Sequence, residues 1–235
     1  MVISEPAPAP SQPVSAVIPA YNEERSISRV LDALCQIPEL RQIVVVDDAS
    51  PDGTSAVVRS YAERDARVCL LRQPANAGKG GAMAAGAEAS DSDIILFLDA
   101  DLIGLRSAHV LSLIGPVCQG LCDMAIGLFF QGRRMTDISH RLTPFLSGQR
   151  CLRWSLFRSI PDLTQARYGI EVALTLHAWR HRYRILSVPW HNVTHVTKYE
   201  KMGVIPAWGS YLRMYGEIVR YAGKYLLKGG DSREP

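Results

Sequence analysis

The stretch IILFLDADL, residues 94–102, decides the fold class of this chain. Five apolar residues run directly into Asp99 and Asp101, which stand one residue apart. A short apolar run without alternation is typical of a strand buried on both faces, as in a parallel sheet that helices cover. The carboxyl end of such a strand is where open α/β sheets bind ligands. The sequence therefore predicts an α/β fold with an acidic site at one edge of its sheet.

Three further apolar runs precede this strand, and segments with helical spacing separate them. The runs lie at residues 14–19, 42–46 and 67–71. We expect Pro19 to end the first strand and Asn22 to cap a helix that begins near Glu23. Polar side chains follow each run, namely Tyr21 and Glu23, then Asp47 and Asp48, then Asn76 and Lys79. Because the carboxyl ends of parallel strands share one edge, these side chains are predicted to line one crevice.

The composition agrees with one sizeable α/β domain, since the chain has 235 residues, 47% hydrophobic and 21% charged. No apolar run reaches the roughly 18 to 20 residues that span a bilayer, and we expect no signal peptide. Residues 1–13, rich in Pro and Ala, are predicted to form a disordered leader. The five cysteines form no CxxC pair, so we expect buried free thiols and a cytoplasmic location.

The charge is unevenly spread along the chain. Residues 1–130 hold 9 Lys and Arg against 16 Asp and Glu, whereas residues 131–235 hold 17 against 7. An acidic first half suits a bound cation, and a basic second half suits an anionic partner, although not a nucleic acid. A chance spread of solvated charges is the alternative interpretation.

Asp99 and Asp101 place two oxygen ligands near one point. Mg²⁺ and Mn²⁺ prefer such ligands, and substrate phosphates usually complete the shell. No Cys and His residues show the spacing of a zinc site. The glycine-rich turn around Lys79 fits neither Walker A nor GxGxxG, yet it can bring backbone N–H groups near a phosphate. The sequence therefore predicts a divalent cation that is bound together with a nucleoside diphosphate.

Five motifs occur in an order and at a spacing that resemble family 2 glycosyltransferases with the GT-A fold. The motifs are VIPAYNEE, IVVVDDASPDGT, NAGKGGAM, FLDADL and LSGQR. The resemblance covers residues 14–205 and points to the dolichyl- or polyprenyl-phosphate mannosyl and glucosyl transferases. It implies a Rossmann-like, mostly parallel sheet sandwiched by helices. It also implies an inverting transfer of a hexose from a UDP or GDP sugar to a polyprenyl phosphate.

The same resemblance implies roles for individual residues. The residues implied at the nucleotide sugar are Pro19, Tyr21, Glu23, Asp47, Asp48, Lys79 and Asp99. Either Asp47 or Asp48 is expected to contact the base or ribose. Asp101 is implied as the metal ligand, with Asp99 beside it. Arg150 is implied as a phosphate contact and Glu171 as the acidic residue beside the acceptor, so Asp101, Arg150 and Glu171 are the expected catalytic residues.

The sequence departs from the family pattern at two positions. Phe129 stands where the lipid-phosphate enzymes often carry the Arg of Gly-x-Arg, and Arg133 or Arg134 is a candidate to replace it. Ile103 stands where a polar residue commonly follows the metal-binding Asp. His195 is therefore a candidate third metal ligand, and a neutral imidazole suits Mn²⁺ better than Mg²⁺. A surface or core histidine without a ligand role is the alternative.

The basic second half is expected to meet the acceptor phosphate. The candidate contacts are Arg133, Arg134, Lys198 and Lys201. Residues 206–228 repeat Trp, Tyr, Leu and Gly at seven-residue spacing, which predicts an amphipathic helix before a flexible tail at 229–235. Its aromatic and basic residues favour peripheral contact with a membrane surface, whereas its glycines favour packing or a homodimer.

Three other functions compete with lipid-phosphate glycosylation. A soluble glycosyltransferase with a hydroxyl acceptor would use the same donor site and would need Glu171 as a base, whereas a phosphate acceptor is already largely dianionic near neutral pH. A sugar nucleotidyltransferase would need a glycine-rich loop where IPAYNEE stands. A nucleotide-binding module without activity would not need Asp99, Asp101, Lys79 and Arg150 together.

Overall fold

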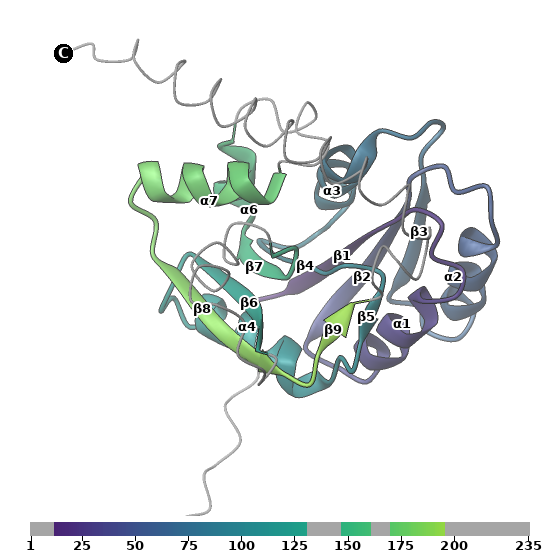
Figure 1. The fold of residues 1–235 in the computed structure, drawn as a ribbon, viewed down its shortest axis with the longest axis horizontal. Coiled ribbons are helices and arrows are strands. Elements are labelled where there is room, and N and C mark those ends of the chain that lie inside the picture. Colours follow the sequence, from purple (N-terminus) through teal and green to yellow (C-terminus); the bar gives the residue numbers. More distant parts are fainter. Residues whose placement is uncertain (1–11, 131–146, 161–169, 196–235) are drawn as a thin grey trace, which may run out of the picture.

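The computed structural model describes residues 12–130, 147–160 and 170–195 (Figure 1). The strands of the main sheet are β1 (Val14–Ala20), β2 (Leu40–Asp47), β3 (Val68–Arg72), β4 (Ile94–Phe97), β6 (Met124–Phe130), β7 (Arg150–Arg153) and β8 (Ile185–His191). A small second sheet pairs β5 (Leu102–Ile103) with β9 (Thr194–His195). The helices are α1 (Ile27–Cys35), α2 (Thr54–Ala62), α3 (Gly78–Glu88), α4 (Ser107–Cys118), α6 (Trp154–Arg158) and α7 (Ile170–Arg180).

The main sheet is mostly parallel. Its seven strands follow the order β3-β2-β1-β4-β7-β6-β8. β1 pairs in parallel with β2 and β4, β2 with β3, and β6 with β8. β7 runs antiparallel to its neighbours β4 and β6. The α/β class and the mostly parallel sheet that the sequence predicts are therefore confirmed.

Both faces of this sheet are buried under helices. Successive residues of β2 face different apolar clusters, with Ile43 and Val45 in one cluster and Val44 and Val46 in the other. The first cluster takes in residues of α1, α2 and α4, and the second takes in residues of α3, α6 and α7. In Figure 1, α3, α6 and α7 lie above the sheet and α1 and α4 below it. Burial on both faces explains why the strands are apolar runs without alternation.

Helix α3 approaches the sheet closely because its residues are small. A Cβ atom at Gly86 would lie 2.4 Å from Cγ1 of Val17 and 2.8 Å from Cγ2 of Val46, so only glycine fits there. Ala82 and Ala87 are buried against the same face. This close packing fixes where α3 begins, and Lys79 is its second residue.

Two local predictions at the end of β1 are wrong. Pro19 lies inside β1, opposite Val46 of β2. Proline has no N–H group to donate, but β4 pairs with β1 only as far as Val17, so no hydrogen bond to β4 is lost at Pro19. Asn22 does not cap a helix that begins near Glu23. Helix α1 begins at Ile27, and Asn22 instead adopts a left-handed turn with φ of 59°.

Several predicted features lie outside the described residues. They are residues 1–11 of the leader predicted at 1–13, the amphipathic helix at 206–228, the tail at 229–235 and the predicted homodimer contact. Arg133, Arg134, Lys198 and Lys201 also fall in segments that are not described. Among the helices of the described part, none is both long and apolar enough to span a bilayer.

Candidate active site

The loops at the carboxyl ends of β1 and β2 are hydrogen-bonded to each other. The backbone N–H of Asn22 donates to Oγ of Ser50 at 3.0 Å, and that of Glu23 donates to Oγ1 of Thr54 at 2.9 Å. These bonds join the loop after β1 to the loop after β2. The two loops are therefore held together at the edge where the sequence predicts a crevice.

Asp48 holds the start of α3 in place. Its two carboxylate oxygens accept hydrogen bonds from the backbone N–H groups of Ala77 at 2.7 Å and Gly78 at 2.8 Å. A carboxylate at a helix N-terminus satisfies N–H groups that have no partner within the helix, and it also complements the helix dipole. Because Lys79 follows at once, Asp48 also fixes the position of that lysine.

Asp47 is fully buried and is bonded inside the protein. Its side chain accepts hydrogen bonds from the N–H of Ser50 at 2.8 Å, from the hydroxyl of Ser55 and from Nη1 of Arg72 at 2.9 Å. The guanidinium of Arg72 also donates to the carbonyl of Ser50 at 2.9 Å. Asp47 and Asp48 thus shape the loops of the crevice, and their direct contact with a nucleotide stays a prediction.

The central feature of the edge is a row of three charged side chains. The Nζ atom of Lys79 lies 2.6 Å from Oδ1 of Asp99 and 2.6 Å from Oε1 of Glu171. Asp99 follows β4, Lys79 begins α3 and Glu171 begins α7, so three separate elements converge here. The structure therefore brings together three residues that the sequence analysis assigned to donor binding and catalysis.

The charges of this row are mutually stabilising. Burial lowers the pKa of Lys79, but the carboxylates of Asp99 and Glu171 outweigh it and raise that pKa well above its ordinary value. For Asp99, burial acts to raise the pKa, but the Lys79 ammonium and the hydrogen bonds to the carboxylate have the larger effect. The pKa of Asp99 is therefore lowered. Lys79 therefore stays cationic and Asp99 anionic at neutral pH.

The segment before β7 covers this row, and the sequence analysis missed its role. Gln149 accepts a hydrogen bond from the N–H of Asp99 at 3.0 Å, and its Nε2 donates to Oδ2 of the same residue at 2.6 Å. A Cβ atom at Gly148 would lie 2.6 Å from Oδ1 of Asp99 and 2.7 Å from Nζ of Lys79. Gly148 and Gln149 stand in the LSGQR motif, of which only Arg150 was assigned a role.

Arg150 lies behind this row and not in the crevice. Its side chain is fully buried, with Nε donating to the carbonyl of Ser147 at 2.8 Å and Nη1 to Oγ1 of Thr175 at 2.8 Å. Burial lowers its pKa to about 10, an effect that the nearby carboxylate of Glu171 opposes. The predicted contact with a phosphate would need an exposed guanidinium group, and packing against α7 leaves none exposed.

The small β5–β9 sheet brings the predicted ligand His195 to the segment that carries Asp99 and Asp101. Asp101 is partly exposed, and the next residue, Leu102, pairs with His195 across the small β5–β9 sheet. His195 is near enough to lower the pKa of Asp99 through its charge. The ring of Phe129 lies 5.8 Å from the ring of His195, so the residue that replaces the expected Arg packs beside the candidate ligand.

These ligands do not form a complete metal site by themselves. Within residues 12–130, 147–160 and 170–195, no three His, Cys, Asp or Glu side chains form a group that could hold a metal ion. Two carboxylates and one imidazole in the same region nevertheless suit Mn²⁺ or Mg²⁺ when substrate oxygens supply further ligands.

The residues at the end of β1 and just after it differ in how exposed they are. Tyr21 is 47% exposed, which leaves an aromatic ring available at the edge. Glu23 is partly buried and accepts a hydrogen bond from the hydroxyl of Ser26. Pro19 is partly exposed within β1. Their contact with a nucleoside stays a prediction.

The family of the chain follows from a comparison with protein-family models. The model described as glycosyl transferase family 2 matches residues 15–186. The chain belongs to this family. The glycosyltransferase resemblance of the sequence motifs is thereby confirmed.

Two kinds of curated glycosyltransferase are similar to this family member. A dolichyl-phosphate beta-glucosyltransferase of Trichomonas vaginalis is 41% identical over 97 residues, which cover 37% of this chain and 30% of that protein. A glucosyl-3-phosphoglycerate synthase of Mycobacterium tuberculosis is 28% identical over 199 residues, which cover 69% of this chain and 60% of that protein. The match spans only about a third of the length of the first of these relatives.

Solved structures share the fold of this glycosyltransferase. The glucosyl-3-phosphoglycerate synthase of Mycobacterium tuberculosis, solved with Mn²⁺, UDP-glucose and phosphoglyceric acid, superposes with a TM-score of 0.72 at 23% identity. That superposition covers 91% of this chain and 80% of the solved chain. The same synthase was also solved with Mg²⁺ and UDP. The overall architecture therefore agrees with the expected Rossmann-like GT-A fold.

Proposed function

We propose that this glycosyltransferase moves a hexose from a UDP or GDP sugar to a polyprenyl phosphate, with inversion at the anomeric carbon. The observation that carries the proposal is the contact of Lys79 with both Asp99 and Glu171 at 2.6 Å. It would join the donor side of the site to the acceptor side through one partly buried cation. The likeness to dolichyl-phosphate beta-glucosyltransferases supports the choice of acceptor.

On the donor side, the protein supplies a rigid set of polar groups. Asp48 orders the N–H groups at the start of α3, and Gln149 orients the carboxylate of Asp99. Tyr21 offers an exposed ring for the nucleoside. In the proposal, Pro19 and Glu23 complete the walls around the nucleoside, and the buried Asp47 holds the loop after β2 in place behind them.

A divalent cation belongs to this proposal. Asp101 would hold Mg²⁺ or Mn²⁺, with Asp99 and His195 as neighbouring ligands and diphosphate oxygens completing the shell. When bound, the ion neutralises the negative charge that develops on the leaving diphosphate. The related synthase, solved with UDP and either Mn²⁺ or Mg²⁺, supports this choice of cation.

On the acceptor side, Glu171 is poorly placed to act as a strong base. Its Oε1 atom already accepts a hydrogen bond from the Lys79 ammonium, and that donor competes with an incoming proton for the same oxygen. A phosphate acceptor needs no such base, because its second pKa is about 6 and it is mostly dianionic at neutral pH. The contact between Lys79 and Glu171 therefore favours a phosphate over a hydroxyl acceptor.

The proposal also assigns roles to the basic second half of the chain, at the acceptor phosphate and at the membrane surface. Arg133, Arg134, Lys198 and Lys201 are proposed to receive the lipid phosphate, while the buried charge of Arg150 acts on Glu171 from behind. The 206–228 segment is proposed to hold the enzyme peripherally on the cytoplasmic membrane face through its aromatic and basic residues. A homodimer through the glycines of that segment is the competing use of it.

A second candidate is transfer to a hydroxyl group of a small phosphorylated acceptor. It is favoured by the glucosyl-3-phosphoglycerate synthase, which matches a larger share of this chain than the dolichyl-phosphate enzyme does. In this reaction Glu171 would have to accept the hydroxyl proton.

A transfer assay decides between the two candidates. The full chain is incubated with labelled UDP-glucose, GDP-mannose or related donors, Mn²⁺ or Mg²⁺, and either undecaprenyl phosphate or 3-phosphoglycerate. We expect label on the lipid phosphate, none on undecaprenol without phosphate, and no transfer in EDTA. Transfer to 3-phosphoglycerate without any transfer to the lipid would replace the proposal by the second candidate.

The variant Glu171→Gln tests the acceptor chemistry independently. With a phosphate acceptor we expect a loss in kcat of less than about tenfold, since no proton has to be removed. With a hydroxyl acceptor the loss of a general base would cost roughly 10²- to 10⁴-fold. Glu88→Gln, at an exposed position near the end of α3, is the matched control.

A further inference from the structure

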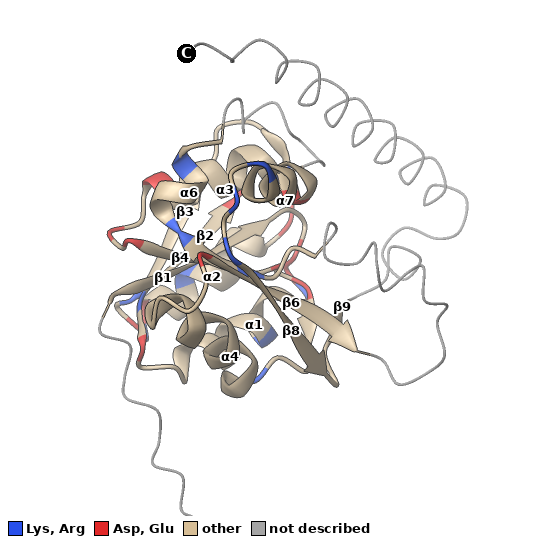
Figure 2. Cartoon of the chain, turned by 90° about the vertical axis from the view of Figure 1, so that its left-hand side faces the viewer, with Lys and Arg blue, Asp and Glu red and all other residues tan. Residues whose placement is uncertain are grey.

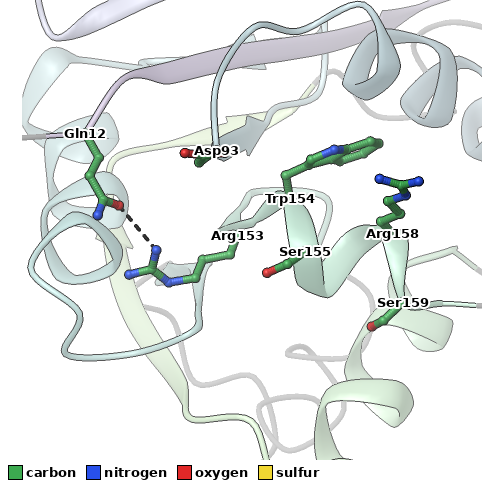
Figure 3. A pocket seen from close by; sticks show the side chains of 7 residues that line it. All are labelled: Gln12, Asp93, Arg153, Trp154, Ser155, Arg158 and Ser159. Carbon is green, nitrogen blue, oxygen red and sulfur yellow. Dashed lines mark hydrogen bonds between the residues drawn. The ribbon is translucent and has the colours of Figure 1, made fainter.

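A hollow lies at the opposite, amino edge of the sheet from the active site. Its volume is about 490 Å³, and its lining residues are Gln12, Asp93, Arg153, Trp154, Ser155, Arg158 and Ser159 (Figure 3). Arg153 pairs with Ile94 at the start of β4, whereas Asp99 follows the end of that strand. At about 3.3 Å per residue, the two positions are roughly 16 Å apart along the strand direction. The hollow is therefore separate from the Asp99–Lys79–Glu171 row.

One end of the hollow is cationic. Arg158 is exposed, and within the described part of the chain it has no ion-pair partner. Ser155 and Ser159 also line the hollow, and the hydroxyl of Ser159 is already bonded to the carbonyl of Leu156 at 2.8 Å and to Nε2 of His177 at 2.8 Å. Figure 2 shows basic residues on α6 and on the α7–β8 connection at this side of the molecule. An exposed arginine without an ion-pair partner is suited to a phosphate monoester.

The other end of the hollow mixes donors and acceptors. Nη1 of Arg153 donates to Oε1 of Gln12 at 3.2 Å, and this bond holds the guanidinium away from Arg158 (Figure 3). Asp93 is exposed at the same end. A carboxylate repels a phosphate but accepts hydrogen bonds from hydroxyl groups. This end therefore suits the hydroxyl groups of a ligand and not its phosphate.

An aromatic ring stands between the two ends. Trp154 stacks on Phe157 with ring centroids 5.7 Å apart and an interplanar angle of 22°, which fixes the ring. It remains partly exposed toward the hollow. A fixed, partly exposed indole offers a flat apolar surface to the face of a ring-shaped ligand. The volume lies within the range of about 300 to 1,000 Å³ that is usual for small-molecule sites.

We propose that this hollow binds a sugar phosphate at a second site, with the phosphate on Arg158, the sugar ring on Trp154 and sugar hydroxyl groups on Asp93 and Gln12. The cationic end, the ring and the mixed polar end follow one another in the order in which a hexose phosphate presents its groups. The proposal does not depend on which acceptor the active site uses.

Isothermal titration of the full chain with glucose 6-phosphate tests the proposal. We expect saturable binding with a Kd below about 1 mM, and weaker binding of inorganic phosphate and of glucose, since each fills only one end. Arg158→Gln should weaken the binding at least about tenfold, because it removes a charge-assisted contact. Its exposed position makes a folding defect from this change unexpected.

Two further variants locate the binding. Arg59→Gln removes an exposed arginine on α2 and should leave the Kd unchanged. Asp101→Asn alters the active site and should also leave it unchanged. Absence of saturable binding overturns the proposal, as does a Kd that Arg158→Gln does not alter. Loss of binding in Asp101→Asn would place glucose 6-phosphate in the active site and would overturn it equally.

Discussion

The two edges of the sheet use charged residues in different ways. At the carboxyl edge, Asp47 is completely buried against Arg72, and Lys79 is enclosed between Asp99 and Glu171. At the amino edge, the Arg41–Asp91 pair has side chains that are 60% and 50% exposed. Buried charges must be paired and hydrogen-bonded in a fixed geometry, whereas exposed pairs are screened by water and contribute little.

This difference matches what each edge has to do. A crevice that receives a diphosphate and a sugar needs carboxylates and a lysine whose positions do not change when water leaves. The exposed Arg41–Asp91 pair has no such requirement, because water screens it. We therefore expect substitutions at the carboxyl edge to have larger effects than equivalent substitutions at the amino edge, and four experiments test this expectation.

The largest effect is expected for Asp101→Asn. The change removes a proposed metal-ligand charge, so transfer should fall by at least about 10³-fold and the thermal stabilisation by UDP with Mn²⁺ should disappear. The fold should persist, because Asp101 is partly exposed. Asp91→Asn, the same change at the amino edge, is the control. Retained stabilisation by UDP and Mn²⁺ in Asp101→Asn would refute the metal assignment.

A smaller but clear loss of stability is expected for Arg72→Gln. It leaves the buried carboxylate of Asp47 without its cation, and breaking a buried pair is costly, although the exposed half of Arg72 reduces the effect to about 2–3 kcal/mol. Urea denaturation measures the change. Adding Asp47→Asn should recover part of the loss. If Arg72→Gln costs no more than the exposed control Arg59→Gln, the two edges do not differ as described.

An intermediate case at the amino edge is Asp65, which precedes β3. Hydrogen bonds from Arg67 lower the pKa of Asp65 to about 2 from its ordinary value of 3.8. A lowered pKa means that the stabilisation is complete above about pH 4 and is lost as the pH falls toward 2. The free energy of unfolding of the wild type should therefore fall between pH 5 and pH 2 by about 1–2 kcal/mol more than that of Asp65→Asn. If the free energy of unfolding depended on pH equally in the wild type and in Asp65→Asn, the lowered pKa of Asp65 would be contradicted.

The smallest effect is expected for the exposed pair of Arg184 and Asp123, in which Nη2 of Arg184 lies 3.1 Å from Oδ1 of Asp123. The side chain of Arg184 is 60% exposed, so Arg184→Gln should barely change the melting temperature, and 1 M salt should reduce the difference further. Thermal denaturation at two salt concentrations measures it. A loss comparable to that of Arg72→Gln would show that exposure does not separate the two edges.

The sequence alone determined the fold class and the edge at which the site lies. Apolar runs such as residues 94–98 are local signals of buried strands, and Asp99 directly after one of them must lie at its carboxyl end. The helix at α3 was also readable, because its glycines and alanines permit close packing on a sheet. Such signals come from residues that are adjacent in the sequence, so they can be recognised without the tertiary structure.

Only the tertiary structure decided which side chains meet. The contact of Lys79 with Glu171 joins residues that are 92 positions apart, and no local pattern encodes such a contact. The same holds for the bond of Gln149 to Asp99 and for the burial of Arg150 behind α7. The adjacent residues Gln149 and Arg150 differ in role because the side chain of Gln149, just before β7, bonds to Asp99, whereas that of Arg150, the first residue of β7, packs against α7. Their orientation therefore depends on strand direction and on helix packing, and both are properties of the assembled fold.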